Sequence, residues 1–85
     1  MVRVTPMEPF AAQFFGGTGA LEVESGTLFA LVDALDRIGP GFAEVAGMRA
    51  AFAVDGAMQT DWSASLGEDA QVTLFQRVAG GDADA

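Results

Sequence analysis

Residues 27–41 read TLFALVDALDRIGPG, and this stretch decides the fold class because a helical period appears here in a chain that elsewhere alternates. Five apolar residues fall on one stripe: Leu28, Leu31, Val32, Leu35 and Ile38. Their spacing of three and four positions predicts an amphipathic helix with one buried face. Thr27 suits the N-cap, and the Gly-Pro-Gly sequence at 39–41 ends the helix. Asp33 and Arg37 are spaced to form an i, i+4 ion pair.

Around this helix the chain alternates apolar and polar residues with the period of two that is typical of strands. Strands are expected at 1–6, 20–24, 49–54, 57–59 and 71–78. The pair Asp55-Gly56 lies between two of them and is a strong signal for a two-residue hairpin. A short helix is expected within 8–17, and one further helical turn at 42–46.

This order of elements predicts an α+β fold with a single domain at 1–79 and a C-terminal tail at 80–85. Ubiquitin-like β-grasp domains have this layout, in which a mixed five-stranded sheet carries one main helix on one face. We expect the strand at 71–78 to be paired inside the sheet rather than at its edge. The fold alone names no function, because it serves electron carriers, protein modifiers and binding modules alike.

The composition excludes many kinds of chemistry. Four Arg, no Lys and twelve Asp and Glu give the 85 residues a formal charge of −8, so no nucleic acid partner is expected. Cys and His are both absent, which removes disulfides, Cys or His metal sites and imidazole catalysis; we expect neither an enzyme nor a bound metal. No apolar run approaches the roughly 18 residues of a membrane span, and no secretory signal opens the chain, so a cytoplasmic protein is expected.

Two groups of residues are of the types found in phosphate-binding or calcium-binding sites, but their spacing does not match the motifs of such sites. The segment Gly16-Gly17-Thr18-Gly19 lacks the lysine of a phosphate-binding loop, so a plain turn is expected. Carboxylates recur at Glu22, Glu24, Asp33, Asp36 and Glu44. They fit no calcium-loop pattern and predict a solvated acidic surface, which could still dock a basic partner. The four methionines and Trp62 are scattered and are expected to pack in the core or at its rim.

Phe75 is a candidate contact residue. The alternation of 71–78 assigns Val72 and Leu74 to the core, which puts Phe75 on the opposite face of the sheet with Thr73 and Arg77. An outward aromatic beside an arginine suits the centre of an interface. The alternative is an isolated surface aromatic, or one that the tail covers.

The occurrence of a Gly80-Gly81 pair is not informative by itself, because Gly-Gly pairs arise by chance in a chain with 11 glycines. Its position in the chain is informative. The pair follows the last expected strand closely, in a tail too short to pack. A backbone without Cβ atoms at this place can thread a narrow channel.

Three stretches together carry a family resemblance. A strand opens at the first residue, Val54-Asp55-Gly56 is similar to a V-N-G hairpin, and residues 66–81 read LGEDAQVTLFQRVAGG. This last stretch is similar to L-x-D-G-D-E-V-x-x-F-x-x-V-x-G-G, and residues 1–81 thus resemble the MoaD/ThiS family of sulfur-carrier proteins, prokaryotic relatives of ubiquitin. The chain departs from the family in lacking the turn glycine at 68–71 and in continuing with four residues, 82–85, past the diglycine.

The resemblance implies a function in sulfur transfer. After a peptidase, such as one of the JAMM type, removes 82–85, a MoeB- or ThiF-like enzyme would use ATP to adenylate the Gly81 carboxylate, and a sulfur donor would convert it to a thiocarboxylate. Gly80, which has no Cβ atom, would let the segment before Gly81 pass through a narrow channel of the partner enzyme. Contacts with the partner would come from Phe75, Arg77, Val78 and Ala79.

The acceptor that the resemblance favours is the molybdopterin precursor, with a MoaE-like synthase large subunit as partner and no cofactor bound by the carrier itself. Two alternatives stay open. One is a carrier for thiazole or another sulfur metabolite, and the other is a β-grasp interaction module that never forms a thioacid.

Overall fold

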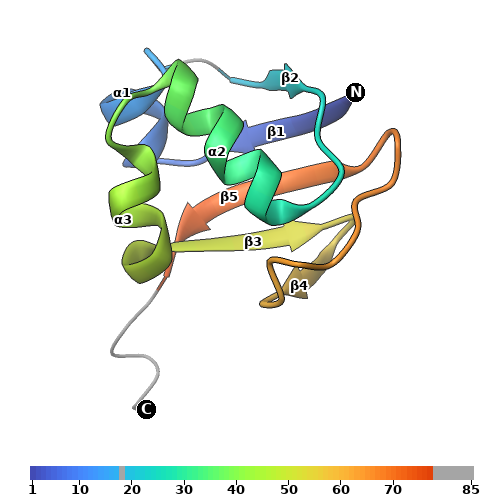
Figure 1. Ribbon diagram of the computed structural model, residues 1–85. Helices are drawn as coiled ribbons and strands as arrows, with labels where there is room; N and C mark the ends of the chain where they lie inside the picture. Colours follow the sequence, from blue (N-terminus) through green and yellow to red (C-terminus); the bar gives the residue numbers. More distant parts are fainter. Residues whose placement is uncertain (18, 78–85) are drawn as a thin grey trace.

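The computed structural model describes residues 1–17 and 19–77, and Figure 1 shows their arrangement. Along the chain the elements are β1 (Val2–Pro6), α1 (Phe10–Phe14), β2 (Leu21–Val23), α2 (Leu28–Ile38), α3 (Phe42–Arg49), β3 (Ala50–Val54), β4 (Ala57–Gln59) and β5 (Gln71–Gln76). Among these residues, no helix is long and apolar enough to cross a lipid bilayer.

The five strands form one mixed sheet in the order β2-β1-β5-β3-β4. The first and last strands, β1 and β5, pair in parallel, whereas the other neighbours are antiparallel. This is an α+β fold with the sheet order of a β-grasp domain, as the sequence predicts. β5 lies at the centre of the sheet, between β1 and β3, so the expectation of an interior last strand is confirmed (Figure 1).

The α2 helix lies across one face of the sheet (Figure 1). Its N-cap is Thr27, whose side-chain oxygen accepts a hydrogen bond from the Ala30 N–H at 3.1 Å. This bond satisfies one of the free N–H groups of the first turn. Asp33 and Arg37 form the expected ion pair on the exposed side.

The α3 helix is longer than the single turn at 42–46 that the sequence predicts, since it continues to Arg49. Its start is stabilised from α2: an Asp36 carboxylate oxygen accepts the N–H groups of Gly41 at 3.1 Å and Ala43 at 3.0 Å. Asp36 therefore caps a neighbouring helix, in place of the purely solvated role expected of it.

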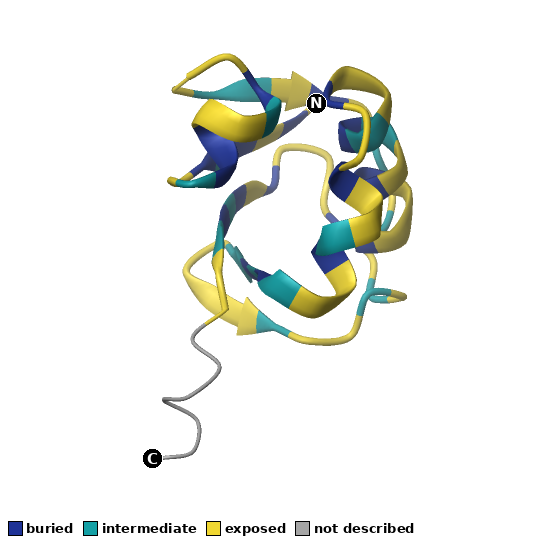
Figure 2. Cartoon of the chain, turned by 90° about the vertical axis from the view of Figure 1, so that its left-hand side faces the viewer, coloured by how far each residue is buried: buried dark blue, intermediate teal, exposed yellow. Residues whose placement is uncertain are grey.

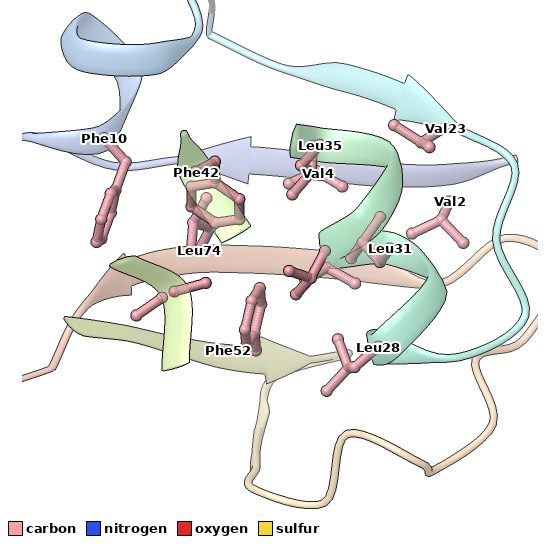
Figure 3. Packing of buried hydrophobic residues seen from close by; sticks show 14 of the residues in the cluster. Val2, Val4, Phe10, Val23, Leu28, Leu31, Leu35, Phe42, Phe52 and Leu74 are labelled. Atoms are coloured by element: carbon pink, nitrogen blue, oxygen red, sulfur yellow. The ribbon is translucent and has the colours of Figure 1, made fainter. Parts of the chain in front are cut away.

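The core lies between the sheet and the helices, where Figure 2 shows the buried positions and Figure 3 the side chains. The largest fully buried side chains come from both layers: Phe10, Phe42, Phe52, Leu28, Leu31, Leu35 and Leu74. Gly39 is buried against Phe14, so closely that a Cβ at this position would overlap the Phe14 carbonyl oxygen. The helical stripe from Leu28 to Leu35 and the inward strand residues therefore meet as their periods predict. Ile38, which the sequence assigns to the same stripe, is 49% exposed at the end of α2, beyond the reach of the core.

The predicted hairpin joins β3 to β4. Asp55 has φ 51° and Gly56 has φ 86°, and two successive positive φ values are characteristic of a type I′ turn. Two sequence expectations need correction and one is narrowed. β5 ends at Gln76, two residues before 78. α3 is a full helix. The four methionines are between 48% and 77% exposed, which excludes the core and leaves the rim of the two places expected for them.

Candidate functional site

The candidate carrier site begins where β5 leaves the sheet. The Arg77 N–H donates to the Arg49 carbonyl oxygen at 2.6 Å, and its guanidinium donates to the Ala50 carbonyl at 3.5 Å. The base of the tail is therefore held beside the first residues of β3 (Figure 1). Four predicted site residues, Val78, Ala79, Gly80 and Gly81, lie outside the described residues.

Phe75 lies on the outer face of the sheet, away from the helices. Its neighbour Leu74 is fully buried opposite Phe52, while Phe75 pairs with Ala51 and is half-buried. Strand periodicity places these two side chains on opposite faces, as predicted. A role of Phe75 in binding stays a prediction.

The neighbours of Phe75 on β3 and earlier in β5 are small and uncharged. Thr73 lies between Thr5 of β1 and Ala53 of β3, and Ala51 lies beside Phe75 itself. On the other side, Met7 follows Pro6 at the end of β1, donates its N–H to the Leu74 carbonyl at 2.8 Å and is 48% exposed, so it adds a second apolar side chain at this end of the face. The arrangement places an aromatic ring among small neutral side chains, two residues before the exposed Arg77, and this combination suits contact with another protein.

Charged groups lie toward the other edge of the sheet and on the helices. Arg3 and Glu22 are paired across β1 and β2, with 3.6 Å between their charged groups, and both are exposed. Glu24, Asp33 and Glu44 are also exposed, in keeping with the expected acidic surface. In the part of the chain that the structure describes, no three acidic, His or Cys side chains come together as a possible metal site.

The structure also reveals a groove that the sequence interpretation missed, which we name the Trp62 groove. It consists of two adjoining hollows of about 370 and 440 Å³ that share Thr60, Trp62 and Arg77. Phe29 and Asp61 line the first hollow, and Phe52 and Met58 line the second. The Trp62 ring contacts both Phe29 and Phe52 edge to face, with centroids 5.6 and 5.7 Å apart.

Backbone hydrogen bonds hold Trp62 in this position. The Phe29 N–H, a free donor of the first turn of α2, donates to the Trp62 carbonyl at 2.9 Å. Further along, the Leu66 N–H donates to the Gly26 carbonyl at 2.8 Å. The irregular segment after β4 is therefore attached to the start of α2, a long-range contact that no local pattern predicts.

Asp61 is fixed at the rim of the groove. One of its carboxylate oxygens accepts the Ser63 hydroxyl at 2.6 Å and the Ser63 N–H at 2.9 Å. The bond from the Ser63 hydroxyl, with that from its N–H, lowers the pKa of the Asp61 carboxyl below its ordinary value. The group is fully exposed and carries its negative charge at neutral pH.

The sequence was compared with models of known protein families and with curated proteins, and it matches neither.

Proposed function

We propose that this chain is a sulfur carrier whose Gly81, once exposed as the C-terminus, is converted to a thiocarboxylate for the synthesis of molybdopterin. The observation that carries the proposal is the path of the last strand. β5 is the central strand of a β-grasp sheet, it is held as far as Arg77, and Gly80-Gly81 follows three residues later. The motif resemblance of 66–81 supports the same function.

The chemistry requires no catalytic side chain from the carrier. Hydrolysis of the Gly81–Asp82 peptide bond frees the Gly81 carboxylate. A carboxylate oxygen attacks the α-phosphorus of ATP, pyrophosphate leaves, and an acyl adenylate forms. Sulfide-level sulfur then attacks the acyl carbon and AMP leaves, so a C–O bond is exchanged for a C–S bond without a change in oxidation state. The carrier is a protein co-substrate in the cytoplasm, and the absence of Cys and His from its sequence is no obstacle.

The length of the tail suits delivery to a buried active site. Gly81 lies four residues beyond Arg77, and four extended residues reach about 13–14 Å. Glycine at the last two positions removes the Cβ atoms that would widen the segment. In this proposal Arg77 stays at the surface of the domain while Gly81 enters the channel of the activating enzyme.

The outer face supplies the docking contact in this proposal. Phe75 is half-buried, and its uncharged neighbours Thr73 and Ala51 would allow the ring to enter an apolar pocket of a MoeB-like enzyme or a MoaE-like subunit. Phe75→Asp would place a charge at the centre of this contact. It is expected to abolish association, whereas Thr5→Ser, a conservative change on the same face, should preserve it.

The test compares the chain ending at Gly81 with the 85-residue chain. Each is mixed with ATP and purified MoeB- and ThiF-type enzymes, and pyrophosphate release is measured. The truncated chain should support release with one of them. The longer chain should be inert until a JAMM-type peptidase trims it, because its Gly81 carbonyl is held in an amide bond to Asp82. If neither chain supports pyrophosphate release with any of these enzymes, the carrier function is rejected.

A second candidate function is a β-grasp interaction module. It is favoured by the peptide bond between Gly81 and Asp82, because this bond leaves Gly81 without a free carboxylate. If residues 82–85 are never removed, the outer face around Phe75 acts without sulfur chemistry. This candidate predicts partner binding that is the same for both chain lengths. A thiazole carrier is distinguished from a molybdopterin carrier by which activating enzyme responds, ThiF-type or MoeB-type.

A further inference from the structure

We propose that the Trp62 groove is a docking site for a partner protein segment that carries an arginine or lysine among apolar residues. The groove lies between the start of α2, α3 and the segment after β4, and its second hollow reaches Ala51 and Met58 of β3 and β4, so it borders the outer face that carries Phe75. This inference does not depend on the sulfur-carrier function.

Exposed apolar side chains around the groove indicate that it binds a partner protein. Phe29 is 60% exposed and Met58 is 61% exposed, and between them Trp62 is only half-buried. Large apolar side chains gathered around a hollow are typical of interfaces, and tryptophan is among the residues that contribute most to binding. The backbone bond from Phe29 to Trp62 holds the two main chains together, and their rings are already in edge-to-face contact without a partner, which lowers the cost of ordering them on binding.

The position of the Asp61 carboxylate and the charge of the whole chain favour a cationic partner. Asp61 lies on the rim next to the Phe29 and Trp62 rings, and an exposed carboxylate beside aromatic rings suits a guanidinium or ammonium group. The formal charge of −8 adds long-range attraction for a basic partner.

The same charge disfavours a second copy of the chain, because two molecules that each carry −8 repel one another. The cation among the lining residues, Arg77, does not reverse this preference. Its guanidinium donates to the Ala50 carbonyl of β3, on the sheet side of the groove, whereas Asp61 lies on the segment after β4. The groove thus offers an acceptor for a cation at one side and a donor for a backbone carbonyl at the other.

Trp62 provides a direct readout, because it is the single tryptophan of the chain and its indole N–H gives one signal in a spectrum of the ¹⁵N-labelled protein. The probes are three acetylated and amidated pentapeptides, Gly-Leu-X-Leu-Gly, in which X is Arg, Gln or Glu. Binding is expected in the millimolar range. The Arg peptide should shift the Trp62 signal saturably, about fivefold more tightly than the Gln peptide, and the Glu peptide should bind most weakly.

Two variants separate the roles of charge and shape. Asp61→Asn should weaken the Arg peptide about fivefold and leave the Gln peptide unchanged, while Asp61→Glu should retain most of the affinity. Phe29→Ala should weaken both peptides, since it removes an apolar wall. The control is Glu24→Gln, which changes the net charge equally but lines a different hollow, beside Met1 and Glu68.

Each other outcome overturns the proposal. Equal binding of the Arg and Glu peptides would show that no cation is selected. Equal weakening by Glu24→Gln and Asp61→Asn would mean that only the general field attracts the peptide. A Trp62 signal that no peptide moves, or that moves with protein concentration alone, would mean that the groove is not a peptide site or is occupied by a second copy.

Discussion

Leu74 and Phe75 are neighbours in β5 whose side chains lie on opposite faces of the sheet, so replacing each by alanine separates the core from the outer face. Leu74 is 0% exposed and belongs to the hydrophobic core. Phe75 is half-buried and lies outside the group of buried core residues. The larger residue should therefore be the less costly one to remove.

The magnitudes follow from burial. Leu74→Ala removes three buried carbon atoms, which costs about 2.4 kcal/mol at about 0.8 kcal/mol each, and the cavity left behind raises the loss to about 3 kcal/mol. Phe75→Ala loses a partly exposed ring and its strand preference, about 1 kcal/mol. A domain of this size has a total free energy of unfolding of about 4–13 kcal/mol, so only the first change threatens the fold.

The assay is thermal unfolding of both variants, followed by circular dichroism. At about 4–8 °C per kcal/mol, Leu74→Ala should lower Tm by about 12–24 °C and Phe75→Ala by less than about 8 °C. Equal losses, or a greater loss for Phe75, would mean that the face assignment of β5 is inverted. Phe75 would then belong to the core and could not be the docking residue.

Three further predictions concern local features of the fold and the groove. Thr27→Ala should reduce the free energy of unfolding by about 1 kcal/mol in urea titration because it removes the cap of α2, and Thr27→Ser should restore most of it. Gly39→Ala should cost about 1–3 kcal/mol by the same measurement, since the new methyl group overlaps the Phe14 carbonyl; no loss would show that the loop shifts freely. The Asp61 carboxyl should titrate below its ordinary pKa in carbon NMR, and Ser63→Ala should return it toward that value. Because the folded-state pKa is the lower one, the stabilisation that these bonds provide is present at neutral pH and is lost as the pH falls through the lowered pKa.

The strands and the main helix could be predicted because their signals are local. The stripe that begins at Leu28 and the hairpin pair Asp55-Gly56 each specify a conformation within a few residues. The alternation in β5 also assigned Leu74 and Phe75 to their faces. α3 was underestimated because it buries few residues and contains Gly47, which lowers helix propensity.

The Trp62 groove could not be predicted for a different reason. Phe29 and Trp62 are far apart in the sequence, and the groove forms only when the segment after β4 bonds to the start of α2. The one signal available was Phe29 itself, an aromatic residue off the buried stripe of an amphipathic helix. Single exposed aromatic residues are common on protein surfaces, and such a residue indicates a binding site only when other apolar side chains lie beside it in space.

Intact-mass analysis of the protein from the cells that make it tests the central claim most directly, because the carrier function requires a particular terminus. The account predicts a species that ends at Gly81, and a second species in which one terminal oxygen has been replaced by sulfur. A protein that retains residues 82–85 and has no sulfur-containing form, in cells that are actively making molybdopterin, would contradict it.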